Sequence, residues 1–250
     1  MGYRVKTIAP NDPPDVFPDP EQMDVALGYP DGLLAIGGDL SPERLLAAYS
    51  QGIFPWYNND QPILWWSPDP RAVIYPEGFH MSRSLLRELR NPAWTYSLNQ
   101  DFSGVIHGCA NNRGEHGTWI TAEMASAYMH LHELGYAHSV ESWHEGELAG
   151  GIYGVRLGSI FFAESMFSAR SAGSKVALSA LVQLCKECGI EMLDCQMESD
   201  HLVTLGMKTL PREHFLQALG ALVVVEAALK WCFPPRPAIE LAELREQPAC

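Results

Sequence analysis

The apolar pattern of the chain changes near residue 70, and this change restricts the possible folds. From residue 71 onward, short apolar runs with the two-residue period of strands alternate with segments that have the helical period of 3.6 residues. This order predicts a mixed α/β fold of the α+β kind. Residues 1–70 are instead rich in Pro, Gly, Asp and Trp. We therefore expect a small amino-terminal domain at 1–70, an α/β domain at 71–233 and a loose tail at 234–250, where little core-forming pattern remains.

Capping residues and turns predict the bounds of the elements. Ser41 can cap a first helix with Pro42 at its first position, and Gly52 ends this helix. Ser82 and Thr121 can cap two helices of the second domain. The helices expected in that domain are 81–90, 122–134, 174–188 and 211–219, and the strands are 71–76, 137–143, 149–157, 159–164 and 191–196.

Composition narrows the class of protein. The chain has 250 residues, of which 47% are hydrophobic and 19% charged, so it can bury a substantial core. No apolar stretch approaches the roughly 20 residues of a membrane span, and the first ten residues lack the apolar core of a signal peptide. We expect a cytoplasmic protein without membrane contact. Its six cysteines are then reduced thiols, and the lone pair Cys185 and Cys188 lacks the second ligand pair of a zinc site.

The formal net charge of −13 argues against broad electrostatic affinity for nucleic acid. Any such contact must be local, and two groups of basic residues could form it. The first has helical spacing, and the second lies near the start and end of one expected helix. A solvated helix face is the alternative interpretation of either group. The groups are Arg83, Arg87 and Arg90, and Arg170, Lys175 and Lys186.

Several motifs occur together between about Phe17 and Phe215. They are GLLAIGGDLSPERLLAAYSQGIFPW, ILWWSPDPRAV, GTWIT, LHELG, GGIYGV and ESMFS. In this order they resemble the leucyl/phenylalanyl-tRNA–protein transferases. The resemblance implies a small amino-terminal domain followed by a domain similar to the GCN5-related N-acyltransferase fold.

The same resemblance implies an activity. Members of this family move Leu or Phe, with Met as a further candidate, from aminoacyl-tRNA to the α-amine of proteins that begin with Lys or Arg. This transfer marks the acceptor for N-end rule degradation. The expected partners are therefore aminoacyl-tRNA and such acceptor proteins, and we expect the enzyme to be a monomer that needs no metal or cofactor.

The reaction itself suggests which residues to seek. An aminoacyl-tRNA ester is already activated, so orienting the attacking amine should dominate catalysis. In the strand EMLDCQ, Asp194 and Gln196 should share a face. We expect Asp194 to accept a hydrogen bond from the Gln196 side-chain amide, which turns the amide oxygen toward the amine; the resemblance implies the same pair. An ordinary polar strand end is the alternative interpretation.

Glu164 follows an apolar strand at the point where the meander opens. Its carboxylate could bind a cation. The resemblance places Glu164 in the substrate site, either near the basic side chain of the acceptor or near an amino group, and the sequence leaves both options open. A solvated glutamate is the alternative.

The donor needs a stacking surface for the terminal adenosine and an apolar pocket. Trp56 matches the adenine-stacking tryptophan of the family, and Trp119 and Tyr128 match aromatic positions near the same end. The family's side-chain pocket corresponds to Ile152, Phe161, Met166, Leu178, Leu181 and Leu193. Ile152 stands where methionine is familiar and Leu181 where an aromatic residue is familiar. Core packing is the alternative for all six.

Two other activities remain open. The segment RSAGSK, from Arg170 to Lys175, partly resembles the loop that holds coenzyme A pyrophosphate, so an acyl-CoA-dependent N-acyltransferase is the enzymatic alternative. A non-catalytic binder of basic protein amino termini is the other. The segment HELGY lacks the second histidine of a metalloprotease motif, so His132 and His138 are interpreted as structural.

Overall fold

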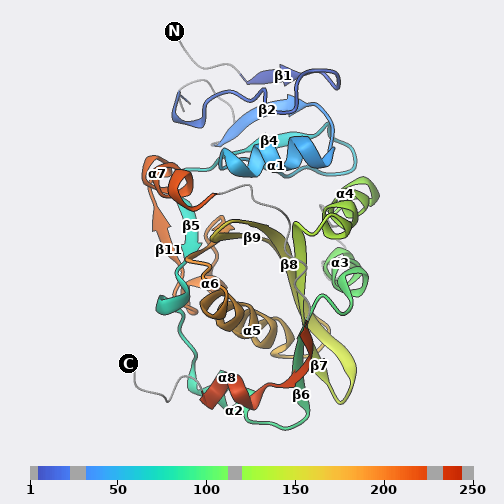
Figure 1. The fold of residues 1–250 in the computed structure, drawn as a ribbon, viewed down its shortest axis with the longest axis vertical. Helices are drawn as coiled ribbons and strands as arrows, with labels where there is room; N and C mark the ends of the chain where they lie inside the picture. The colour runs from blue at the N-terminus through green and yellow to red at the C-terminus, as the bar shows by residue number, and fades with distance from the viewer. Residues whose placement is uncertain (1–4, 23–31, 112–119, 224–232, 244–250) are drawn as a thin grey trace.

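The computed structural model describes residues 5–22, 32–111, 120–223 and 233–243. In these residues the chain forms two sheets (Figure 1). The smaller sheet has the order β1-β2-β4-β3 and carries α1 (Pro42–Ser50). Its strands are β1 (Lys6–Ile8), β2 (Leu33–Gly37), β3 (Phe54–Pro55) and β4 (Leu64–Trp66). The sequence pattern had indicated only the helix, because strands of two to five residues leave almost no period to recognise.

The start of α1 confirms the predicted position but not the predicted cap. Ser41 is the N-cap residue and Pro42 opens the helix, yet the Ser41 side chain makes no capping hydrogen bond. Instead, the Asp39 carboxylate accepts the backbone N–H of Ser41 over 2.8 Å and also pairs with Arg44. The two caps expected further along are confirmed, since Ser82 accepts from Leu85 and Thr121 accepts from Met124.

The larger sheet has the order β11-β5-β10-β9-β8-β7-β6-β12 among the described residues. All neighbours in it are antiparallel except β9 and β10, which run parallel. The strands are β5 (Arg71–Ile74), β6 (Trp94–Leu98), β7 (Ala137–His144), β8 (Glu147–Leu157), β9 (Ile160–Ser168), β10 (Met192–Gln196), β11 (Lys208–Leu210) and β12 (Phe233–Pro237).

Helices cover both faces of this sheet (Figure 1). On one face lies α5, with ten buried residues that form much of one core cluster. On the other face lie α3 and α4, whose buried side chains join a second cluster together with α1. The helices of this domain are α2 (Arg83–Leu89), α3 (Phe102–Asn111), α4 (Ala122–Glu133), α5 (Gly173–Glu187), α6 (Asp200–Val203), α7 (Arg212–Leu222) and α8 (Ile239–Glu243). In the part of the chain described, no helix is both long and apolar enough to cross a membrane.

The expectation of a loose tail from residue 234 is wrong for the described part of that segment. β12 pairs with β6 at the edge of the sheet, and the buried residues Ala238, Leu241 and Ala242 pack near α2. The segment PPRPAIELAE has few apolar residues and several prolines, which is unusual for a strand but is tolerated at a sheet edge. Residues 244–250 lie outside the described residues.

Candidate active site

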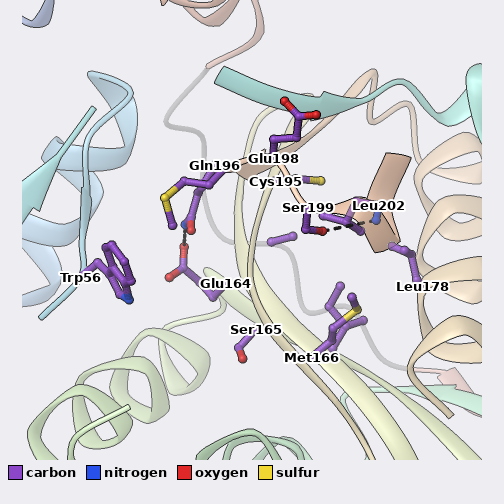
Figure 2. Close-up of a pocket in the computed structure, with 13 residues that line it drawn as sticks. Trp56, Glu164, Ser165, Met166, Leu178, Cys195, Gln196, Glu198, Ser199 and Leu202 are labelled. Carbon is purple, nitrogen blue, oxygen red and sulfur yellow. Dashed lines mark hydrogen bonds between the residues drawn. The ribbon is translucent and has the colours of Figure 1, made fainter. Parts of the chain in front are cut away.

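A pocket opens where β9 and β10 stop pairing (Figure 2). The two strands pair over three positions, the last of which joins Asp194 to Phe162. Beyond this point β9 continues beside β8, whereas β10 ends in a bulge at Gln196. The cavity has a volume of about 320 Å³ and is lined by side chains from β8, β9, β10, α5, α6 and the segment after β3. Such a cleft at the ends of strands is a usual place for a substrate.

Glu164 lies on β9 in the wall of this pocket, with 7% of its surface exposed. The Tyr128 hydroxyl, from α4, donates to Oε2 over 2.8 Å, and the Gln196 side-chain amide donates to Oε1 over 2.7 Å. Tyr49, from α1, shares a hydrogen bond with the Tyr128 hydroxyl. Burial raises the pKa of Glu164 to about 7, although hydrogen bonds from the two tyrosines lower it. This carboxyl can therefore exchange a proton near neutral pH.

Asp194 does not line the pocket, and its partner differs from the expected one. It is fully buried, and its two oxygens accept from Nε and Nη2 of Arg71 over 2.8 and 2.6 Å. Its Oδ1 also accepts the backbone N–H of Gln196 over 2.9 Å. We expected the side-chain amide of Gln196 to donate to Asp194, and this is wrong. Asp194 holds the backbone at Gln196 instead of its side chain.

A bulge in β10 explains the difference. The register between β10 and β5 shifts between Asp194 and Gln196, and Gln196 has a φ of 64°, in the left-handed region. Side chains two apart share a face only in a regular strand, and a bulge re-aims one of them. The Gln196 amide consequently turns to Glu164 on the neighbouring strand (Figure 2).

Trp56 is the one member of the Trp56, Trp65 and Trp66 group that lines the pocket among the described residues. The Trp66 indole donates to the Trp56 carbonyl over 2.7 Å, and the two rings meet edge to face. Trp65 is fully buried and donates to the Gly37 carbonyl, so it belongs to the core. In Figure 2 the hydrogen-bonded Glu164 and Gln196 lie between the Trp56 ring and the apolar side chains on the other side of the pocket.

The apolar wall contains part of the expected side-chain pocket. Ile152, Met166 and Leu178 line the cavity, together with Cys195 and Leu202, which the sequence had not indicated. The other expected pocket residues are buried in the core cluster around α5 and lie outside the cavity lining; they are Phe161, Leu181 and Leu193. Trp119 lies outside the described residues.

Comparison with known proteins identifies the family. The profile described as leucyl/phenylalanyl-tRNA protein transferase matches residues 73–220, and that of the family's N-terminal domain matches residues 38–69. The chain belongs to the leucyl/phenylalanyl-tRNA–protein transferase family. The family member from Xanthomonas axonopodis pv. citri is 51% identical over 98% of this chain and 99% of its own length. That from Nitrosospira multiformis is 53% identical over 84% and 92%.

The resemblance seen in the motifs is thus confirmed, and the enzyme is an aminoacyltransferase. The expected fold class, a small amino-terminal domain followed by a mixed α/β domain, is confirmed as well. Among solved structures, a GCN5-related N-acetyltransferase from Kribbella flavida is similar with a TM-score of 0.37 and 9% identity, over 68% of this chain and 61% of that one.

The basic residues that were considered for tRNA contact lie on α2 and on or next to α5. Those of α2 are exposed, and α2 lies at the end of the larger domain remote from the smaller sheet (Figure 1). Arg170 is exposed before α5, and Lys175 is half-buried in its first turn. Lys186 pairs with Glu77 over 3.3 Å. The exposed arginines of α2 and of its C-cap position are Arg83, Arg87 and Arg90.

The two histidines of the discounted protease motif are structural, as expected. His132 stacks on Phe102 with ring centroids 4.1 Å apart and contacts the Ala137 carbonyl. His138 is buried, which lowers its pKa to about 3, and it bonds Asn99. Among the described residues, no group of three His, Cys, Asp or Glu side chains could hold a metal ion.

Sequence reasoning missed two site residues. Tyr49 lies within the helix expected between Ser41 and Gly52 and was given no role in the site, but its hydroxyl shares a hydrogen bond with the Tyr128 hydroxyl. Arg71 was interpreted only as the start of a strand, but it forms the buried pair with Asp194. An arginine at the first position of an otherwise apolar strand, RAVI, is the one local sign that could have drawn attention to it.

Proposed function

We propose that this aminoacyltransferase moves Leu or Phe from aminoacyl-tRNA to the α-amine of proteins that begin with Lys or Arg, marking them for N-end rule degradation. It would act in the cytoplasm, as a monomer and without a cofactor. The observation that supports this best is one pocket that combines an apolar wall, the half-buried Trp56 and the pair Glu164 and Gln196. The two sheets and the two family profiles also support a domain boundary near residue 70.

The donor would be held from two sides. The terminal adenine stacks on Trp56, an interaction worth about 1–3 kcal/mol in other proteins. The leucine or phenylalanine side chain packs against Ile152, Met166 and Leu178, where the unbranched methionine can adapt to either guest. Phe161, Leu181 and Leu193 support this wall from the core.

The acceptor would enter beside the carboxylates. Of the described residues that line the pocket, Glu164 and Glu198 are acidic and none is Lys or Arg. This charge favours an acceptor with a basic first residue.

Gln196 would orient the attacking amine. An ionised Glu164 can only accept hydrogen bonds, so the Gln196 amide must present its NH₂ group to it. The amide oxygen then accepts an N–H of the incoming amine. The amine nitrogen forms a bond to the ester carbonyl carbon, the bond from that carbon to the ribose oxygen breaks, and the proton lost by the nitrogen passes to the ribose oxygen directly or through water.

The acyl-CoA alternative has less support. In the segment that resembles a pyrophosphate loop, three backbone donors are engaged internally: Arg170 donates to the Ala149 carbonyl over 3.0 Å, Gly173 to the Arg170 carbonyl over 3.0 Å, and Ser174 to Ser168 Oγ over 2.8 Å. Amides engaged in this way do not bind a phosphate.

One assay tests the proposal. The pure protein is incubated with radiolabelled leucyl-tRNA and three peptides that differ only in beginning with Lys, Arg or Ala. We expect label in the first two peptides and not in the third, and none in a Lys peptide whose α-amine is acetylated. Label transferred from acetyl-CoA instead would support the acyl-CoA alternative, and binding of the Lys peptide without any product would support a non-catalytic binder.

A further inference from the structure

Arg71 contacts several parts of the protein next to the site, which its place in the sequence did not indicate. It is fully buried at the start of β5, and its Nε and Nη2 bond both oxygens of Asp194 on β10. Its Nη1 donates to the Gly52 carbonyl over 3.1 Å. The guanidinium lies between the rings of Phe54 and Phe215, 4.9 and 4.6 Å from their centroids. All faces of this cation are therefore occupied by the protein.

This geometry is that of a bidentate pair, which fixes direction as well as charge. A carboxylate with a single point-charge partner can rotate, whereas a fork of two parallel bonds holds its plane. The plane matters here because Oδ1 of Asp194 also accepts the backbone N–H of Gln196. Arg71 thus fixes the plane of the Asp194 carboxylate, and the carboxylate in turn fixes the backbone N–H of Gln196 at the bulge.

Gln196 needs such support. Its φ of 64° is a conformation that a non-glycine residue adopts only when its surroundings impose it. If the carboxylate turned away, the backbone could relax toward an extended strand, and the side chain would leave Glu164. The orientation of the amide therefore depends on a chain of contacts that begins at Arg71.

We propose that Arg71 is a positioning residue for aminoacyl transfer, acting through Asp194 on the left-handed backbone of Gln196 and so on the amide that meets the amine. Arg71 touches no substrate. The inference rests on the proposed function, because it concerns the rate of that transfer. The buried ion pair orients Gln196. An apolar pair of similar volume would contribute about as much to the free energy of unfolding.

The decisive variant replaces both charges, Arg71→Met with Asp194→Leu. Replacing a buried ion pair with apolar residues of similar volume often preserves stability, whereas removing one partner leaves a buried charge unpaired. We expect the double variant to fold, with a melting temperature near that of the wild type. We expect its kcat to fall by about 100-fold, with the KM for leucyl-tRNA within about threefold, as for an interaction made only in the transition state.

Arg44→Met provides the matched control. Arg44 is also a buried arginine, with 1% of its surface exposed, but it pairs with Asp39 and donates to the carbonyls of Asp12 and Pro13, in the segment that follows β1. Arg44→Met should lower the melting temperature and leave kcat unchanged. A purely structural role for Arg71 predicts that the single variant Arg71→Met behaves in the same way.

Two results would overturn the inference. A folded double variant that keeps kcat within about threefold of the wild type means that Gln196 needs no aiming by this pair. If the double variant does not fold, Arg71→Lys provides the test, because lysine keeps the charge and loses the two parallel hydrogen bonds to Asp194. An unchanged kcat in folded Arg71→Lys also overturns the inference. A fall in kcat without a rise in KM supports it. A wild-type protein that transfers no leucine from leucyl-tRNA would instead refute the proposed function.

Discussion

Two buried carboxylates in this enzyme differ in what surrounds them. Glu141, on β7, is fully buried and accepts from the hydroxyls of Ser97 and Ser139, both over 2.5 Å, and from the backbone N–H groups of Gln100 and Asp101 over 3.4 Å. Its donors are backbone groups and short side chains of β6, β7 and the connection to α3.

Glu164 accepts from the long side chains of Tyr128 and Gln196, and one side of it faces the pocket. Burial raises the pKa of both glutamates. A raised pKa by itself therefore does not identify the reacting group. The two glutamates differ in whether a substrate can reach them and in whether it can replace their hydrogen-bond donors. We therefore interpret Glu141 as a residue that holds the ends of β6 and β7 together, and Glu164 as part of the site.

The largest effect should come from Glu164→Gln. Gln has one side-chain oxygen where Glu164 has two, so it cannot accept from both Tyr128 and Gln196 in the same way. The Gln196 amide would lose its orientation, and we expect kcat to fall by at least about 100-fold, the loss that a misplacement of about 1 Å can cause. Steady-state kinetics with leucyl-tRNA and a Lys peptide measure this. Glu141→Gln is the control and should leave kcat within about twofold of the wild type. Equal losses in the two variants would remove the distinction between the two carboxylates.

The pH dependence of stability tests the raised pKa that the two carboxylates share. The pKa of Glu164 is raised from 4.5 to about 7 on folding, so its contribution to stability is fully present below pH 4.5 and is lost as pH rises through 7. Relative to Glu164→Gln, the wild type should lose up to about 3 kcal/mol of unfolding free energy between these values. Urea titrations at a series of pH values measure this difference. Glu141→Gln should show a trend of the same sign, because the Glu141 pKa is also raised; a difference that does not vary with pH for Glu164→Gln contradicts the assignment.

A double-mutant cycle at Asp194 and Gln196 should give a somewhat smaller effect. If Asp194 acts only through Gln196, Asp194→Asn and Gln196→Ala should each reduce kcat by roughly 10 to 100-fold, and the double variant should be little worse than the worse single variant. Single-turnover rates with saturating leucyl-tRNA provide the comparison. Strictly additive free-energy losses would mean that the two residues act separately.

The smallest effect expected is that of Trp56→Ala. The ring lies on the far side of the Glu164 and Gln196 pair from the apolar wall, and it packs only against Trp66 among the aromatic contacts described. Loss of adenine stacking should raise the KM for aminoacyl-tRNA by roughly tenfold, within the 1–3 kcal/mol usual for such contacts, and should leave the fold intact. Trp65→Ala, which removes a buried ring, should instead lower the melting temperature; an unchanged KM in Trp56→Ala would exclude the stacking role.

Local patterns predicted much of the larger domain. The helix expected at 122–134 is observed at Ala122–Glu133, and that expected at 174–188 at Gly173–Glu187. These segments carry caps and a helical period, which depend on neighbours within one or two turns. The strands of the smaller sheet, β6, β11, β12 and the helix α3 were missed. These strands have two to five residues, so they show little period and take their stability from partners far along the chain. The helix α3 contains Gly104 and Gly108, which weaken the helical signal.

What the sequence by itself determined is the family, the order of the main elements and the residue types at the site, since all of these depend on motifs and on spacings of two to four residues. Only the tertiary structure decided the pairing within the site. Asp194 meets Arg71, 123 positions away, and Gln196 meets Glu164, 32 positions away. These contacts follow from the strand order β5-β10-β9 and from a bulge that reverses the expected direction of one side chain. A local period carries no information about which strands become neighbours, and a one-residue bulge cancels the alternation on which the prediction depended.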